Sequence, residues 1–121
     1  MLASIHLPQA KPVFASSNFQ NGDESVIGDD LELSNYINQQ LTDIASRSTV
    51  DEINFINRST APDAWILSGK YKVLGEDISV KINIRQNKTS KYLFEESGTK
   101  ANLTDLAAKI VRRATEWILK K

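Results

Sequence analysis

The sequence has no cysteine and only one histidine, His6, in its 121 residues. The absence of cysteine excludes a disulfide framework, a cysteine-ligated zinc finger and a thiol nucleophile. A single imidazole leaves little material for histidine-based catalysis. A membrane-spanning helix needs about 20 consecutive apolar residues, and no run in this sequence approaches that length. The sequence therefore predicts no membrane insertion, and the lack of cysteine does not fix a compartment.

The amino terminus also lacks the basic segment and the long apolar segment of a secretory signal. A start of this kind is expected when a domain has been excised from a longer protein or trimmed of its leader. Residues 1–10 show no periodicity and contain Pro8, so we expect a loose arm or a short edge strand there. Residues 11–121 have the length of one compact unit with one core, and we expect them to form a single domain.

Positive and negative charges balance over the whole chain but are unevenly placed. Residues 1–52 carry eight acidic and two basic residues, whereas residues 53–121 carry seven acidic and thirteen basic residues. A dipolar domain of this kind can orient on a partner or associate with itself head to tail. The alternative is that its solvated faces simply differ in sign.

Two segments have the spacing of amphipathic helices. Between about Asp30 and Arg47, apolar residues recur every three or four positions, at Leu33, Ile37, Leu41, Ile44 and Ala45. This spacing predicts a helix with one buried face, capped by Asp29 or Asp30. A second helix is predicted at the carboxyl end, capped by Asn102 or Thr104, with an apolar stripe of Leu103, Leu106, Ala107, Ile110, Val111, Ala114, Trp117 and Ile118.

The other regular segments alternate as strands do. A first strand is expected over Pro12–Phe19 and a short second one over Ile53–Asn57. Three more follow at the spacing of a meander, over Ala64–Leu74, Ile78–Arg85 and Lys91–Ser97, with Tyr92 and Phe94 of the last pointing inward. The clearest signal in the chain is the unbroken alternation with polar residues of Ile78, Val80, Ile82 and Ile84.

The order strand, helix, four strands, helix predicts an α+β protein. We expect a two-layer sandwich in which a mixed, mostly antiparallel sheet of about five strands carries two helices on one face. Because only one parity of each strand is apolar, the helices should cover that face while the lysine- and serine-rich face meets water. A right-handed crossover through the first helix would make the first two strands parallel and leave the rest antiparallel.

This arrangement resembles a known family. The matching pieces are Phe19-Gln20-Asn21 at the end of the first strand, the glycine- and aspartate-rich loop, a helix centred on Leu41-Thr42, the strand Trp65–Tyr71 and the hairpin into Ile78–Arg85. From about Lys11 to Leu119 the chain resembles the amino-terminal domain of TolB and TolB-like proteins, which is related in architecture to the periplasmic lipoproteins CsgG and LpoB. The most specific piece is Leu-Ser-Gly-Lys-Tyr with its hairpin. The first ten residues and the lack of an attached propeller depart from the family pattern.

The resemblance implies a non-catalytic module that docks other envelope proteins, or an accessory domain of a larger signalling chain. The family has no catalytic residues to carry over. A bacterial, periplasmic or cell-envelope location follows if the resemblance holds, and a cytoplasmic one follows if the domain belongs to a signalling protein.

The residues themselves predict no catalytic, cofactor-binding or metal-binding site, and thus no enzyme. Adjacent acids such as Asp29 and Asp30 suit turns and helix caps, since general acid–base catalysis needs carboxyls that face one cleft. The glycines do not form a phosphate-binding pattern, and the acidic loop lacks the ligand spacing of a calcium-binding EF-hand. Trp65 and Trp117 are expected in the core. Gly69, inside a strand, indicates a bulge or the close approach of an aromatic ring.

One constellation does suggest binding. The solvent face of the predicted meander gathers five basic residues, Lys70, Lys72, Lys81, Arg85 and Lys91. Such a face can bind an acidic partner or a phosphate backbone, or it can serve only to keep the sheet from aggregating. Nucleic-acid platforms interleave aromatic residues with the basic ones, whereas here the aromatic residues fall on the other parity.

The sequence therefore favours a non-enzymatic protein–protein interaction module that acts through a sheet edge or the basic face, with self-association as a further option. The alternative is a ligand-sensing accessory domain with a small molecule between helices and sheet. Nucleic-acid binding is the least favoured hypothesis.

Overall fold

The computed structural model describes residues 12–46, 53–58 and 61–120, and the predicted arm over residues 1–10 lies outside them. Two short strands, β1 (Val13–Phe14) and β2 (Asn18–Asn21), precede helix α1 (Leu33–Ala45) and strand β3 (Asn54–Phe55). Three long strands follow, β4 (Trp65–Leu74), β5 (Asp77–Gln86) and β6 (Thr89–Thr99). A 3₁₀ turn (Lys100–Asn102) then leads into helix α2 (Leu103–Leu119).

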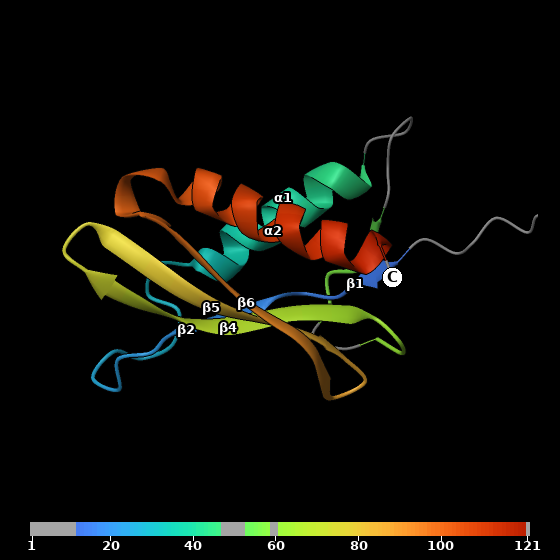
Figure 1. Cartoon of the computed structure of the whole chain (residues 1–121), viewed down its shortest axis with the longest axis horizontal. Coiled ribbons are helices and arrows are strands. Elements are labelled where there is room, and N and C mark those ends of the chain that lie inside the picture. The colour runs from blue at the N-terminus through green and yellow to red at the C-terminus, as the bar shows by residue number, and fades with distance from the viewer. Residues whose placement is uncertain (1–11, 47–52, 59–60, 121) are drawn as a thin grey trace, which may run out of the picture.

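The two helices lie together on one face of the sheet, and the other face is open (Figure 1). This is the predicted two-layer α+β sandwich, with six strands in place of about five. The helices cover the predicted face, where the buried residues of β5 are Ile78, Val80, Ile82 and Ile84. Among the residues described, no helix is long and apolar enough to cross a membrane.

The predicted first strand is split, because residues 15–17 separate β1 from β2. Both halves pair with β4, at Phe14–Trp65 and again from Asn18–Ser68 onward. They therefore lie one after the other along the same side of β4. The expected parallel pairing of β1 with β3 is confirmed. The expectation that all other pairs are antiparallel is wrong, since β4 starts beside Phe14 and runs parallel to both β1 and β2.

The helix caps agree with the expectation in residue type, with one difference in geometry. Asn102 accepts a hydrogen bond from the backbone of Asp105 and caps α2. Helix α1 begins at Leu33, later than predicted, because Glu32 has a left-handed backbone with φ +57°. Asp29 nevertheless caps it from outside the first turn, and its two oxygens each accept a hydrogen bond from a backbone N–H, of Leu33 and of Ser34, at 2.8 Å.

The meander is built as expected, with β5 and β6 longer at both ends than predicted and β4 one residue shorter. Gly75, at φ +63°, opens the tight turn that sets Leu74 opposite Asp77. Asn87 and Lys88 both have positive φ, which is the geometry of a two-residue hairpin turn that matches the strand twist. Phe94 is buried as predicted, whereas Tyr92 is 37% exposed and stacks on Trp117 of α2.

Candidate functional site

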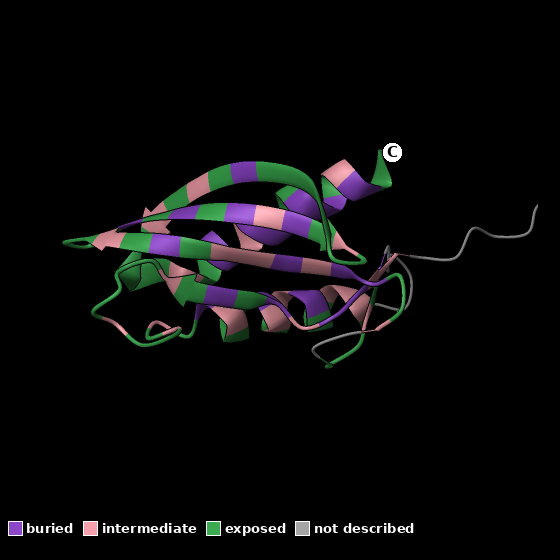
Figure 2. Ribbon diagram, turned by 90° about the horizontal axis from the view of Figure 1, so that it is seen from below, coloured by how far each residue is buried: buried purple, intermediate pink, exposed green. Residues whose placement is uncertain are grey.

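The side of the sheet turned away from the helices, here called the open face, carries the outward residues of the three long strands (Figure 2). On β4 and β5 these include Lys70 directly opposite Lys81, and Lys72 directly opposite Ser79. All three lysines are exposed. Directly opposed residues on one sheet face have Cβ atoms about 5 Å apart. Three ammonium groups therefore share a small surface.

These three lysines form no ion pair with any residue that the structure describes. Glu95 of β6 lies opposite Lys81, without an ion pair between them. Like charges directly opposite each other weaken a sheet. The centre of the open face thus carries three lysines that form no ion pair with a described carboxylate.

The lysines border a hollow of about 700 Å³ between the open face and the loop of residues 21–30, which projects from the sheet on the side away from the helices (Figure 1). Lys70, Lys72, Lys81 and Lys100 contribute the cations of its lining. Asp23 and Asp30 contribute carboxylates from the loop. The hollow is therefore basic over the strands and acidic along one wall.

Lys100 belongs to this site and was not predicted from the sequence. Its backbone N–H donates to the carbonyl of Glu76 at 2.9 Å, which fixes the start of the 3₁₀ turn beside the β4–β5 hairpin. Lys100 follows Lys81 by a whole strand and a turn, and no local spacing connects the two. Only the antiparallel return of β6 brings them together.

Arg85 and Lys91 lie outside the hollow. Arg85 lies opposite Ile66 at the far end of β5 and lines a separate hollow of about 360 Å³. Its guanidinium reaches the carbonyl of Lys88 at 3.5 Å. Lys91 lies where the register of β5 and β6 shifts, and has no directly paired residue on β5. The five predicted basic residues thus divide into a group of three and two separate cations.

The acidic wall is held in place by its own hydrogen bonds. The N–H of Asn21 donates to the carbonyl of Gly28 at 2.8 Å, which closes the loop at its base. Hydrogen bonds from the backbone and hydroxyl of Ser25 lower the pKa of the Asp23 carboxyl. The side-chain amide of Asn21, helped by the hydroxyl of Tyr71, lowers the pKa of Asp30. Both carboxyls are therefore charged at neutral pH.

Tyr71 connects the loop to the sheet and to α1. Its hydroxyl lies 2.6 Å from Asp29 Oδ1 and 3.0 Å from Asp30 Oδ1, and it accepts a hydrogen bond from the N–H of Leu31. Burial, followed by the hydrogen bond to Asp29, raises the pKa of Tyr71 well above its ordinary value. The neutral phenol therefore acts as a structural clamp that positions the wall.

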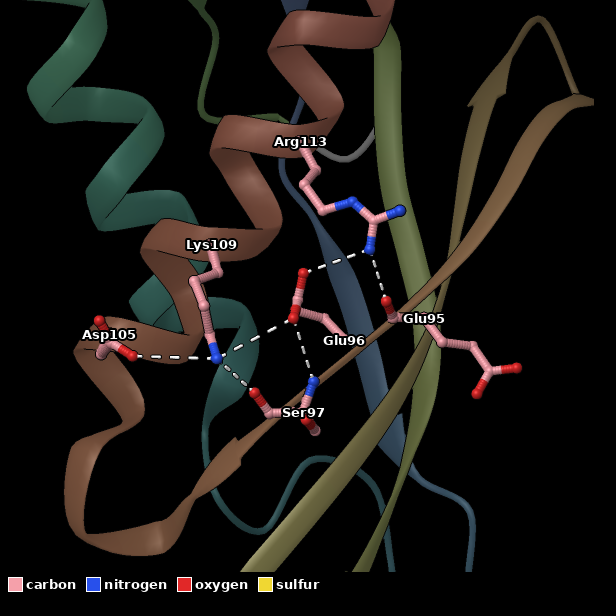
Figure 3. A network of polar contacts seen from close by, with 6 residues as sticks. All are labelled: Glu95, Glu96, Ser97, Asp105, Lys109 and Arg113. Atoms are coloured by element: carbon pink, nitrogen blue, oxygen red, sulfur yellow. Dashed lines mark hydrogen bonds and ion pairs between the residues drawn. The ribbon is translucent and has the colours of Figure 1, made fainter.

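The outer edge of β6 is covered by two cations of α2 (Figure 3). Arg113 Nη1 donates to the carbonyl of Glu95 at 2.7 Å, and Lys109 Nζ donates to the carbonyl of Ser97 at 2.6 Å. Both side chains also pair with the carboxylate of Glu96, which points toward the helix. The sequence places Lys109 and Arg113 on the polar side of α2 but does not show this contact.

The outer edge of β2 is covered in the same way from α1. The N–H of Ser17, just before the strand, donates to Asn38 Oδ1 at 2.8 Å, and the N–H of Phe19 donates to Ser34 Oγ at 2.8 Å. Side chains of a helix thus occupy donors that a further strand would need. A covered edge of this kind resists strand addition.

Within the described ranges, no group of three or more histidine, aspartate or glutamate side chains is arranged to hold a metal ion. The adjacent acids Asp29 and Asp30 serve the helix cap and the loop, as the turn-and-cap interpretation predicts.

The fold and the site define an α+β sandwich with a basic, open sheet face. No protein-family model matches the chain. No curated protein is similar to it in sequence. A solved structure described only as that of an uncharacterized protein is similar in fold, with a TM-score of 0.47 and 10% sequence identity over 91% of this chain and 90% of that one.

Proposed function

We propose that the chain is a non-enzymatic docking module, which binds an acidic surface of another protein through the open face. The observation that carries this proposal is the direct opposition of Lys70 and Lys81, with Lys72 beside them and no ion pair to offset them among the described residues. An acidic partner would supply the missing negative charge and would be steered to the face before contact.

The protected edges favour the open face over strand addition. Lys109 and Arg113 cover the carbonyls of β6, and side chains of α1 cover the backbone of β2. A partner strand could not pair with these stretches without displacing the helix contacts. The open face needs no such rearrangement.

The resemblance to TolB-like amino-terminal domains supports the same role, because that family is one of non-catalytic docking and accessory modules. With this resemblance, the proposed setting is a bacterial cell envelope or a larger signalling protein. The partner would then be another protein of that compartment.

Ligand sensing is a second candidate, favoured by the size of the hollow. Its volume of about 700 Å³ falls in the range of small-molecule sites. The ligand would lie between the open face and the 21–30 loop. The interior is unsuited, because Ile37, Ile82 and Ile110 are all fully buried within one hydrophobic core.

Nucleic-acid binding is less favoured because the aromatic residues needed for base stacking lie elsewhere. Tyr71 and Phe94 are buried on the helix side, and Tyr92 stacks on Trp117.

Charge reversal on the face tests the proposal. Lys70→Glu, Lys81→Glu and Arg85→Glu combined should abolish retention of the partner from a host extract, while thermal unfolding changes little because all three side chains are exposed. The control, Arg112→Glu with Lys120→Glu, reverses two exposed charges, one on α2 and one at its carboxyl cap, and should retain the partner. A retained protein is identified by mass spectrometry, purified and titrated against each variant. Equal affinity for all variants would exclude the open face.

A further inference from the structure

The hollow beside the 21–30 loop continues into a second one across the sheet. The second hollow has a volume of about 610 Å³ and shares Lys72 and Ser79 with the first. It reaches Ser97 and Thr99 on β6. The two together, here called the trough, run from the loop across β4, β5 and β6.

Apolar groups line the trough between its charges. Leu74 lines the second hollow and is 77% exposed, and Val26 and Val73 line the first. Ile27, in the loop that forms the wall, is 96% exposed. The charged side chains that line the second hollow with Leu74 are Lys72, Asp77 and Lys109, and Asp77 lies directly opposite Leu74. An apolar contact with a charged rim is the arrangement of a protein interface.

The dimensions of the trough match a short extended segment. Neighbouring strands lie about 4.8 Å apart. The four strands β2, β4, β5 and β6 therefore measure about 15 Å from the axis of β2 to the axis of β6. An extended chain advances about 3.3 Å per residue. A segment of about four or five residues therefore spans the trough.

We infer that the trough binds an extended acidic segment of a partner protein, with an aliphatic side chain against Leu74. This inference rests on the proposed function and names the chemistry of the partner. The carboxylates of the segment lie over Lys70, Lys72 and Lys81. Its end beside the loop is neutral or basic, because Asp23 and Asp30 repel an acid there.

The same acidic wall distinguishes a peptide from a nucleic acid. A phosphate backbone carries a negative charge on every unit and would meet Asp23 and Asp30 with like charge. A peptide can place acids over the strands and an uncharged residue beside the loop. The geometry therefore favours a peptide over a uniform polyanion.

The test uses fluorescein-labelled peptides at low ionic strength, with binding followed by fluorescence anisotropy. The probe is Lys-Glu-Leu-Glu-Glu. In the two control peptides, serine replaces the leucine, or lysines replace the glutamates. We expect the probe to bind, the serine peptide to bind several-fold more weakly and the lysine peptide not to bind. Raising the salt from about 50 to about 300 mM should weaken the probe by about tenfold, since charges on an exposed face are screened.

Variants of the protein locate the peptide. Lys70→Ala with Lys81→Ala should weaken probe binding about tenfold or more, and Leu74→Ser should remove the preference for the leucine peptide. Arg112→Ala with Lys120→Ala, on α2 and at its carboxyl cap, should leave the affinity unchanged. Circular dichroism and thermal unfolding establish that each variant is folded.

Three outcomes would overturn the inference: no binding of the probe, equal affinity of the Lys70→Ala/Lys81→Ala variant, or tighter binding of an oligothymidylate than of the probe. The proposed function can be judged separately. If charge reversal abolishes retention of the partner while the probe does not bind, the open face is the docking surface and the short acidic segment is wrong. If both tests fail, so does the proposed function.

Discussion

Gly69 shows how one missing side chain lets the sheet form. It lies on the helix side of β4, where a Cβ atom would overlap the carbonyl of Lys81 and lie 3.1 Å from the ring of Phe19. The sequence predicts a bulge or the close approach of an aromatic ring, and the structure shows the ring of Phe19 there together with the backbone of β5. Neither obstacle moves easily, since one is the backbone of β5 and the other is a fully buried ring.

Gly69→Ala should therefore destabilise the fold by about 2–3 kcal/mol, the usual cost of overpacking a close-packed interior. Urea unfolding measures the change in free energy. Ser79→Ala, at an exposed position of the neighbouring strand, is the control and should change it by less than about 0.5 kcal/mol. An unchanged stability for Gly69→Ala would show that the contact is not tight.

Tyr71 makes the stability of the folded protein depend on pH in the alkaline range. Its pKa is raised in the folded state by burial and by Asp29, whereas an unfolded tyrosine has a pKa near 10. The folded state therefore holds the phenolic proton more tightly. The stability that this provides is complete below about pH 10 and is lost as the pH rises further.

Tyr71→Phe should lower the free energy of unfolding by about 1–3 kcal/mol at neutral pH, because a hydrogen bond to a carboxylate and a partner of the Leu31 N–H are lost. It should also reduce the fall in stability between about pH 9 and pH 11. Urea unfolding of both proteins across this range is the measurement. An identical alkaline slope in the variant would show that Tyr71 does not titrate with unfolding.

At the scale of elements, α2 both covers the core and protects the edge of β6. Ala107, Ile110 and Ala114 are fully buried, while Lys109 and Arg113 reach over the strand to its carbonyls. The same helix thus buries the hydrophobic core and prevents a further strand from pairing with β6. This leaves the open face as the accessible surface of the long strands.

Lys109→Ala with Arg113→Ala should expose this edge and promote self-association. Light scattering during incubation in mild denaturant should rise faster than for the native protein, because uncovered strand edges template pairing. Arg112→Ala with Lys120→Ala removes the same amount of charge from α2 and its carboxyl cap, and this variant should not aggregate faster. Equal scattering by both double variants would show that the α2 contacts do not protect β6.

The helices and strands that the sequence predicts most accurately are those set by a single local residue pattern. The alternation Ile78, Val80, Ile82 and Ile84 fixes β5 whatever lies beside it. Strand direction depends on distant pairing, and the parallel run of β4 beside β1 follows from where Trp65 meets Phe14. No local pattern contains that information. The gap between β1 and β2 escaped prediction for the same reason.

The candidate site was only partly predictable. Lys70, Lys72 and Lys81 share a parity on strands joined by a short turn, so the sequence could bring them together. Lys100 and the acidic wall reach the site only through the return of β6 and through the Tyr71 hydroxyl, which contacts Asp29 and Asp30. Such contacts depend on the whole fold.

At the scale of the whole molecule, the charge imbalance of the sequence becomes a local contrast. The acidic first half contributes the 21–30 loop, and the basic second half contributes the lysines beside it. The acidic loop and the lysines meet at the trough, so opposite charges lie side by side at one site. A partner that matches both signs can be oriented there as well as attracted.

The central claim is that binding occurs on the open face, away from the helices and the edges. The most direct test is a titration of ¹⁵N-labelled protein with the probe Lys-Glu-Leu-Glu-Glu, followed by amide chemical shifts. The account predicts that the shifts concentrate at Lys70, Lys72, Ser79 and Lys81 and leave the amides of α2 in place. Shifts confined to α1 and α2, or to the outer edge of β6, would contradict it.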